Sequence, residues 1–406
     1  MRKTVSLAVL ALLGIAGMSG GLIGGLGAAT LASAKPESVG MSSKRLGLLD
    51  SILNDAVARR ELPGAVVLVS RKGKTVYRKA FGQSQLVPEP RPMTPDMIFD
   101  LASVTKPVAT ATAVMVLVER GAIRLWDQVS QYVPEFSPWY GEKGLAGEPV
   151  RLYHLLTHTS GLPPYTDAKA AGEKLGDPCA TADLARLIAA LPKESPAGTT
   201  FVYSCLNYIT LAHIVQEVSG RSLADFTAET IFRPLGMAKT FYSPAEACWN
   251  ECVPTEVVGG QPLRGVVHDP LARLQGGVSG NAGLFSTADD LAVFAQMLLD
   301  GGEANGARIL SPLAVRRMTE IYPRLEAAGR GLGWDIETDY STVRGDLFGP
   351  SSYGHSGFTG TSIWIDPETG TAVVFLTNSV HPDGHGDIRA LRSKVANIVA
   401  AAVLAK

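Results

Sequence analysis

The stretch GAVVLVSRKGKTVYRKAF, residues Gly64 to Phe81, decides the fold. Its first part, Gly64–Ser70, is an uninterrupted apolar run rich in valine, which favours a buried strand. Arg71–Lys74 has the polar and glycine content of a turn, and Thr75–Phe81 returns as a second strand. The early part of the chain therefore predicts a β-hairpin.

The β pattern returns only near the other end of the chain. A turn at Pro367–Gly370 separates the last two of the predicted strands. The further strands predicted from the sequence are Met97–Asp100, Leu332–Thr338, Gly360–Ile365 and Thr371–Thr377.

Helical periodicity occupies the middle of the chain and both flanks. Ser42 or Ser43 can cap a first helix, in which Leu46, Leu49, Leu53 and Val57 share one face. Asp290 follows Thr287 by three residues, as in a capping box. The other predicted helices are Ser103–Glu119, Thr181–Leu191, Asn207–Val218, Thr287–Leu299 and Ile388–Leu404.

These patterns predict an α+β architecture. Both ends of the chain (about 35–102 and 330–406) form one antiparallel sheet, which terminal helices cover. A mostly helical region, about 103–329, is inserted between them. Binding clefts commonly form at such junctions.

Composition excludes several classes of protein. The 406 residues are 46% hydrophobic, with 37 Lys and Arg against 38 Asp and Glu. This is enough apolar material for a full core and rules out a disordered chain. Without a basic surplus, nucleic-acid binding is disfavoured.

Residues 1–34 have the features of a secretory signal peptide. Arg2 and Lys3 precede an uncharged stretch that ends in Ala32-Ser33-Ala34, a small-x-small cleavage pattern. The sequence thus predicts a periplasmic or secreted protein whose mature chain is 35–406. The alternative is an uncleaved membrane anchor, because the uncharged stretch is long enough to span a bilayer.

Export would allow the four cysteines, Cys179, Cys205, Cys248 and Cys252, to form disulfides. Cys248 and Cys252 are close enough in sequence to reach each other, but three full pairings exist and the sequence does not choose among them. A zinc site is the weaker alternative, because no second pair of ligands stands at a matching spacing.

Ser103-Val-Thr-Lys106 is the S-x-x-K motif of the chain. It follows a predicted strand and opens an apolar helix, so Lys106 would lie one turn from Ser103. A desolvated Lys106 near a helix N-terminus could act as the base that activates Ser103. The alternative is that Ser103 only caps the helix. The one G-x-S-x-G match, Gly17–Gly21, lies inside the leader and is discarded.

Two later motifs follow in order, Tyr203-Ser-Cys205 and His355-Ser-Gly357. With S-x-x-K, they resemble the three motifs of the penicillin-recognising serine enzymes, which include class C β-lactamases, D,D-peptidases, D-aminopeptidases and related esterases. The resemblance runs along almost the whole mature chain. It is carried further by PGAVVLVSRKG (Pro63–Gly73), HLLTHTSGLP (His154–Pro163), PLGM (Pro234–Met237), GGVSGNAGLFSTADDLAVFAQMLL (Gly276–Leu299) and GHSGFTGTSIWIDPETG (Gly354–Gly370).

The resemblance implies a β-lactamase/transpeptidase-like fold and a role for each motif residue. Ser103 would be the acylated nucleophile, Lys106 its proton acceptor and Tyr203 the proton shuttle to the leaving group. The backbone N–H groups of Ser103 and Phe358 would form the oxyanion hole. His355, Gly357 and Cys205 would contact the substrate. No metal or organic cofactor is implied.

The sequence departs from the family pattern at two of these positions. Cys205 stands where the second motif has asparagine, which helps to hold the lysine and the amide side chain of the substrate; a thiol is a poor hydrogen-bonding group by comparison. Asn207 is near but two residues late. His355 replaces the lysine of K-T-G, a fixed cation that attracts the carboxylate of β-lactams and D-Ala-D-Ala ends, whereas histidine is mostly neutral at pH 7.

The remaining histidines have ordinary interpretations. His154 and His158 stand at a helical metal-pair spacing but are expected in a structural loop beside the site. His268-Asp269 is interpreted as loop scaffolding. His381 and His385, with Asp383 and Asp387, resemble a surface metal cluster, although a polar loop explains them equally well.

The prediction is an exported serine hydrolase that cleaves an ester or amide through an acyl-enzyme, of the esterase or D-amino-acid peptidase type. Its substrate would be a small ester, an amide or a cell-wall peptide, and a membrane would be a partner only with the leader uncleaved. One alternative is a class C-like β-lactamase or D,D-carboxypeptidase. Another is a penicillin- or muropeptide-binding protein with little turnover, for which Cys205 is the supporting feature.

Overall fold

The structure is a computed structural model that describes residues 29–141, 144 and 146–404. Most of the predicted leader lies outside the described residues. The described end of the leader, residues 29–34, runs beside the sheet, where Ser33 forms a bridge with Thr75. The Ala29 N–H donates to the Gly236 carbonyl of the inserted region.

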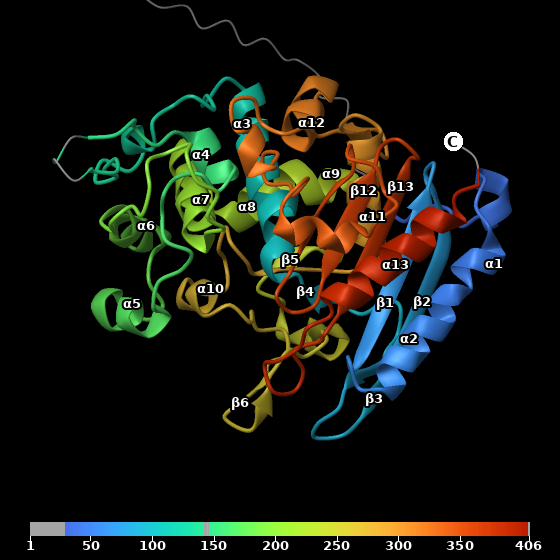
Figure 1. Ribbon diagram of the computed structural model, residues 1–406. Coiled ribbons are helices and arrows are strands. Elements are labelled where there is room, and N and C mark those ends of the chain that lie inside the picture. The colour runs from blue at the N-terminus through green and yellow to red at the C-terminus, as the bar shows by residue number, and fades with distance from the viewer. Residues whose placement is uncertain (1–28, 142–143, 145, 405–406) are drawn as a thin grey trace, which may run out of the picture.

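One antiparallel sheet joins the two ends of the chain (Figure 1). Its centre is the pairing of the Gly64–Arg71 strand with the Thr371–Thr377 strand, in a register that sets Ala65 opposite Thr377. The prediction that both ends build this sheet is confirmed. The strands in spatial order are β11 (Tyr353–Ser356), β12 (Ser362–Asp366), β13 (Thr371–Thr377), β1 (Gly64–Arg71), β2 (Lys74–Gln85) and β3 (Arg91–Pro92).

Strand β1 is apolar throughout because both of its faces are covered. Val66 and Leu68 point into one apolar cluster, whereas Ala65, Val67 and Val69 point into another. The helices from the two chain ends, α2 and α13, lie across the second face (Figure 1). The covering elements are η1 (Pro36–Val39), α1 (Ser43–Leu46), α2 (Leu48–Ala58) and α13 (Arg389–Ala402).

The first face packs on the inserted helical region, in which the central helices are almost fully buried. The elements before the Gly-rich loop, residues 276–283, are η2 (Ala102–Val104), η3 (Lys106–Ala111), α3 (Thr112–Glu119), η4 (Val129–Gln131), α4 (Leu152–Leu156), α5 (Ala168–Leu175), α6 (Thr181–Ala189), α7 (Cys205–Ser219), α8 (Leu223–Thr227), η5 (Ala228–Phe232), α9 (Arg233–Leu235), η6 (Glu246–Glu251) and α10 (Pro270–Leu274). Those after it are α11 (Ala288–Leu299), α12 (Pro312–Thr319), η7 (Glu326–Ala328) and η8 (Asp339–Arg344).

Small sheets complete the inserted region. The strand predicted at Met97–Asp100 is only two residues long and belongs to one of these sheets rather than to the main one. The small sheets are β4 (Phe99–Asp100) with β8 (Leu284–Ser286) and β5 (Phe241–Tyr242), β6 (Val257–Val258) with β7 (Gln261–Pro262), and β9 (Glu303–Ala304) with β10 (Ala307–Arg308).

The prediction of a strand at Leu332–Thr338 is wrong. Only Asp335 forms isolated bridges there, to Arg330 and Gly354. The start of this segment bonds to helices instead: the Leu332 N–H donates to the Met318 carbonyl of α12 and the Gly333 N–H donates to the Leu156 carbonyl of α4. Alternating apolar residues cannot distinguish a strand from a turn that is buried against helices.

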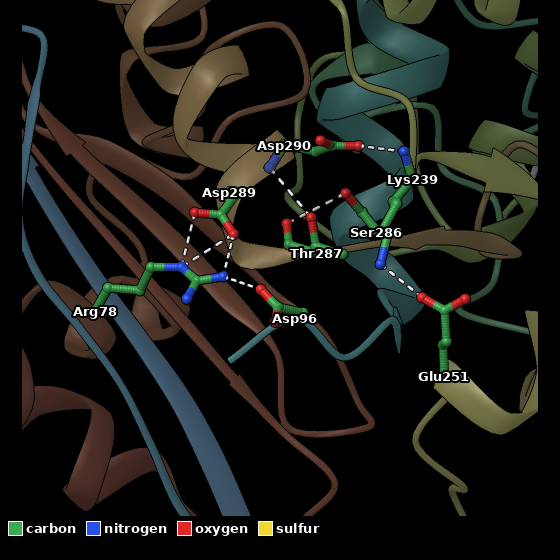
Figure 2. Close-up of polar contacts among 8 residues, drawn as sticks. All are labelled: Arg78, Asp96, Lys239, Glu251, Ser286, Thr287, Asp289 and Asp290. Atoms are coloured by element: carbon green, nitrogen blue, oxygen red, sulfur yellow. Dashed lines mark hydrogen bonds and ion pairs between the residues drawn. The ribbon is translucent and has the colours of Figure 1, made fainter. Parts of the chain in front are cut away.

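The start of α11 is tied directly to two other segments, residues 239–240 and β2, and through Arg78 to Asp96 (Figure 2). Thr287 caps the helix by accepting from the Asp290 N–H, but the Asp290 carboxylate accepts from the Lys239 N–H and the Thr240 hydroxyl, so the predicted capping box is only half formed. On the other side, Arg78 of β2 pairs with Asp289 and Asp96. These contacts fix the end of the Gly-rich loop that leads into β8 and α11.

Candidate active site

Ser103 lies in η2, three residues after the end of β4 and directly after a strained residue. Ala102 has a φ of 46°, in the left-handed region that disfavours alanine. Its N–H donates to the Asp100 carboxylate, which also accepts from the His268 N–H. Burial raises the pKa of Asp100. The buried Asp100 therefore holds the bend that presents Ser103.

Lys106 lies one turn later and is fully buried. Its Nζ donates to Ser103 Oγ at 2.9 Å, to the Asn281 carbonyl at 2.9 Å and to Cys205 Sγ at 3.5 Å. Burial disfavours its ammonium form, but Cys205 and Tyr203 act in the other direction, and the pKa of Lys106 is raised above its ordinary value. This direction is opposite to the one expected from desolvation alone.

Tyr203 lies two residues before the start of α7 and packs against both Lys106 and the third motif. Lys106 Nζ lies 5.1 Å from the centre of the Tyr203 ring, and the His355 ring lies 6.0 Å from it. On its other side the ring contacts His158, 4.5 Å away. The three predicted motifs are thus brought together by elements far apart in sequence.

His355 is buried in β11, and its Nδ1 faces the Ser356 carbonyl at 2.8 Å. Burial, and then the charges of Arg330 and Lys106, hold the pKa of His355 well below its usual range. The ring is therefore neutral at pH 7, so His355 does not supply a fixed cation in place of the family's lysine.

The loop after His355 is fastened to the backbone just before Ser103. The Thr361 hydroxyl donates to the Leu101 carbonyl at 2.9 Å, and the Thr359 hydroxyl donates to the Asp100 carbonyl at 2.8 Å. A Cβ on Gly357 would lie 2.4 Å from the Leu101 carbonyl oxygen, so this approach requires glycine. The loop places Phe358, whose ring stacks on His268, at the same cavity as Ser103.

Arg392 of α13 also holds the loop that follows His355. Its Nη2 donates to the carbonyls of Gly357 and Thr361, both at 3.0 Å. Burial lowers the pKa of Arg392 to about 10. The C-terminal helix therefore contributes a positioning group that no motif marks.

A cavity of about 900 Å³ opens over these groups. Its rim is aromatic, with Tyr165, Tyr340 and Phe358 exposed at 37%, 47% and 66%. The predicted site residues that line it are Ser103, Tyr203, Cys205, His355, Gly357 and Phe358. The charged residues in its wall are Asp269, Arg330, Asp335, Asp339, Asp387, Arg389 and Arg392.

Sequence reasoning missed two further residues at the site. Asn281 lies in the Gly276–Leu299 stretch, which entered the sequence analysis only for its resemblance to the family, yet its backbone carbonyl accepts from Lys106. The side chain of Arg330 lies in the cavity wall and is only 1% exposed. Its Nη1 pairs with Asp335 Oδ1 at 3.2 Å, and no sequence pattern pointed to it.

The other histidines make structural contacts. His154 Nδ1 accepts from the Arg151 N–H, and His381 Nε2 accepts from the Leu86 N–H. His268 joins the cavity wall, so the segment interpreted as scaffolding also borders the site. Among the described residues no group of three or more His, Cys, Asp or Glu side chains is arranged to hold a metal ion, and all four cysteines are free thiols.

The chain is similar to curated relatives and to solved structures over most of its length. Two relatives come from Salmonella agona and Salmonella typhi, and both are provisionally named D-alanyl-D-alanine carboxypeptidase. Each is 32% identical to this chain over 378 residues, and the match covers 86% of this chain and 86% of the relative. EstCE1, described as a hydrolase with promiscuous acyltransferase activity, superposes with a TM-score of 0.71 at 23% identity and covers 88% of this chain and 99% of its own. The octameric penicillin-binding protein homologue from Pyrococcus abyssi gives 0.64 at 24% identity, with 88% and 77% covered.

These structural neighbours are below 25% identity and show the shared fold. Membership rests on the family model described as Beta-lactamase, which matches residues 49–397 and so takes in all three motifs. The chain belongs to the beta-lactamase family.

Proposed function

We propose that this protein is an exported serine hydrolase that cleaves an ester or amide through an acyl-enzyme on Ser103. The observation that carries the proposal is the 2.9 Å contact between Lys106 Nζ and Ser103 Oγ beside a cavity that Ser103 and Tyr203 line. A serine becomes a nucleophile when a neighbouring group accepts its proton.

In the proposed reaction Ser103 Oγ attacks the substrate carbonyl and its proton passes to neutral Lys106. The negative charge that develops on the carbonyl oxygen is stabilised by the N–H groups of Ser103 and Phe358. Tyr203 carries the proton from Lys106 to the leaving alcohol or amine as the carbon–oxygen or carbon–nitrogen bond breaks. Water then attacks the acyl-enzyme, its proton passes through Tyr203 and Lys106 to Ser103 Oγ as the bond from the acyl carbon to that oxygen breaks, and the acid is released.

The character of the cavity supports an ester or a D-amino-acid amide or peptide as substrate. His355 is neutral, so the third motif offers no cation to a substrate carboxylate. The rim residues Tyr165, Tyr340 and Phe358 offer apolar surface to an acyl or aryl group. The fold is also that of EstCE1, whose description names a hydrolase.

A second candidate function, D,D-carboxypeptidase or β-lactamase activity, is favoured by Arg330. Its Nε and Nη2 are buried and have no hydrogen-bond partner among the described residues, although Arg330 lines the cavity. A guanidinium can bind a carboxylate through two parallel hydrogen bonds. The names of the Salmonella relatives point the same way.

The test is intact-mass spectrometry with turnover measured in parallel. Wild-type protein and Ser103→Ala would each receive an activated p-nitrophenyl ester, a D-alanyl anilide and penicillin, with the exposed Ser351→Ala as the matched serine control. We expect adducts and turnover with the ester or anilide that Ser103→Ala abolishes and Ser351→Ala retains.

Other outcomes point to the alternatives. Penicillin as the fastest substrate, with loss of that activity in Arg330→Lys, would replace the proposal with the second candidate. Stoichiometric labelling of Ser103 without turnover would identify a binding protein. Adducts that persist in Ser103→Ala would refute the nucleophile.

Export is part of the same proposal and rests on the charged start and small-x-small end of residues 1–34. Cell fractionation with N-terminal sequencing tests it. We expect a mature chain outside the cytoplasm that begins near Lys35; a full-length chain in the membrane fraction would favour the anchor instead.

A further inference from the structure

Tyr203 lies within residues 201–204, which form neither helix nor strand, and the residues on either side of it are both bonded to His158. The Val202 N–H donates to the His158 carbonyl at 2.9 Å, a bond that any residue at position 158 would keep. The Ser204 N–H donates to His158 Nδ1 at 3.0 Å, and this second bond needs the imidazole. One residue thus holds the backbone before and after Tyr203.

The imidazole of His158 also supports the ring of Tyr203. The two ring centres are 4.5 Å apart and the ring planes are inclined by 30°. Lys106 Nζ lies 5.1 Å from the centre of the same Tyr203 ring. His158 is fully buried and is not among the residues that line the cavity, so it can act on a substrate only through its neighbours.

The contacts of His158 decide where its ring carries a proton. Because Nδ1 accepts from the Ser204 N–H, the single proton of the neutral ring is on Nε2. The Asn207 Nδ2 faces the same Nδ1 at 3.3 Å. Burial, and then the charges of Arg330 and Lys106, hold the pKa of His158 well below its usual range. The ring therefore stays neutral at pH 7, and Nδ1 keeps the lone pair that the Ser204 bond requires.

Packing alone does not account for a histidine at this position. The Nε2 of His158 is buried and has no hydrogen-bond partner among the described residues. A buried donor without a partner costs free energy that an apolar side chain of similar size would avoid. The backbone of His158 also has a φ of 58°, in the left-handed region that few side chains adopt. The Nδ1 acceptor is the property that an apolar residue could not supply.

We propose that His158 is a positioning residue for Tyr203, which it holds through the bond from the Ser204 N–H to its Nδ1 and through the contact of the two rings. In the proposed reaction Tyr203 carries the proton to the leaving group. A displaced Tyr203 would slow that transfer while Ser103 and Lys106 remain in place. The inference rests on the proposed function, because it requires Tyr203 to be the proton carrier.

This role predicts an effect that depends on the leaving group of the substrate. A p-nitrophenolate leaves as a stable anion and needs no proton, whereas the oxygen of an ethyl ester must be protonated as its bond to the acyl carbon breaks. Displacement of Tyr203 should therefore slow acylation by an ethyl ester more than acylation by the p-nitrophenyl ester of the same acid. A loss of folded protein would slow both reactions equally.

The test compares kcat/KM for these two esters in His158→Gln and His158→Asn. Asparagine bonds Oδ1 to Cγ as histidine bonds Nδ1, and it tolerates positive φ, whereas glutamine offers no acceptor at that place. We expect His158→Gln to lower kcat/KM about 10-fold or more for the ethyl ester and less than about 3-fold for the p-nitrophenyl ester. His158→Asn should recover most of the loss.

The matched control is His154→Gln. His154 is also buried, and its Nδ1 also accepts a backbone N–H, that of Arg151, at 3.0 Å, but it lies outside the cavity wall. Both esters should keep their wild-type kcat/KM in this variant. Thermal melts verify folding, and His158→Gly, which suits the positive φ, repeats the comparison with the same expected result where His158→Gln does not fold.

Tyr203→Phe separates failure of this inference from failure of the proposed function. It should show the same dependence on the leaving group, more strongly than His158→Gln does. If Tyr203→Phe slows both esters equally, the proposed route of the proton is wrong. If Tyr203→Phe shows the dependence but the folded His158 variants do not, or if His158→Asn recovers nothing, the inference alone is overturned.

Discussion

In the proposed mechanism, Lys106 is the residue whose protonation decides when Ser103 can react. It is fully buried, yet its pKa is raised because Cys205 and Tyr203 outweigh the effect of burial. A base can take a proton only from its neutral form. The resting enzyme at pH 7 therefore holds Lys106 as an ammonium that donates to Ser103.

This protonation state predicts an alkaline activity profile. We expect kcat/KM for a p-nitrophenyl ester to keep rising with pH to at least about pH 9, because the ordinary pKa of lysine is already about 10.4. Stopped-flow acylation rates, corrected with Ser103→Ala for spontaneous hydrolysis, measure the profile. A plateau that begins below pH 7 would contradict a raised pKa of Lys106.

The buried histidines predict sensitivity to acid. Burial holds the pKa values of His158 and His355 well below their usual range, so the unfolded chain binds protons that the folded protein excludes. Their contribution to stability is present above the unfolded pKa of about 6.5 and is lost as pH falls below it.

We therefore expect Tm to fall steadily between about pH 7 and pH 5. Differential scanning calorimetry of the wild type, His355→Gln and the exposed His385→Gln tests this. The slope of Tm against pH should flatten in His355→Gln alone. Equal slopes in all three proteins would contradict the assignment.

At the scale of elements, residues 357–361, the proposed oxyanion loop, depend on a helix from the end of the chain. Strand β11 carries His355, but residues 357–361 are held from one side by hydroxyl contacts to Asp100 and Leu101 and from the other by Arg392 of α13. The position of the Phe358 N–H is thus set by three separate segments.

Substitution of Arg392 by methionine should loosen this loop. Since Arg392 touches neither Ser103 nor Lys106 among its hydrogen bonds, we expect kcat to fall about 10-fold with a smaller change in KM, because an oxyanion donor acts in the transition state. Lys394→Met, an exposed change on the same helix, is the control. Equal loss in kcat and in the amount of folded protein would mean that Arg392 is only structural.

At the scale of the whole molecule, the main sheet is built from strands of both chain ends, so it cannot form from either end alone. Strands β1 and β13 are neighbours at its centre, and α11 of the inserted region packs on both of them. Neither half can bury its apolar face without the other, so the molecule should unfold in a single cooperative step.

Hydrogen exchange can test that cooperativity. We expect the slowest amides of β1 and β13 to share one opening free energy with those of α7 and α11, which carry or adjoin the catalytic groups. Mass spectrometry of exchanged peptides across a urea series gives these values. A lower, separate opening energy for the inserted region would show that it unfolds by itself.

Local patterns in the sequence determined the framework of this protein. The apolar runs at Gly64–Ser70 and Thr371–Thr377 became the central strands, and the S-x-x-K, tyrosine and H-x-G motifs met at one cavity. Strand alternation, helical periodicity and a one-turn spacing are local properties, so they can be recognised without knowing what lies across the fold. The limit of this reasoning is Leu332–Thr338, where apolar alternation accompanied a turn packed on helices.

Only the tertiary structure decided what surrounds those motifs. The neutrality of His355, the raised pKa of Lys106 and the contributions of Asn281, Arg330 and Arg392 all depend on residues distant in sequence that fold into contact. Burial and the charges of spatial neighbours set these properties, and neither is encoded in the residue's own local pattern.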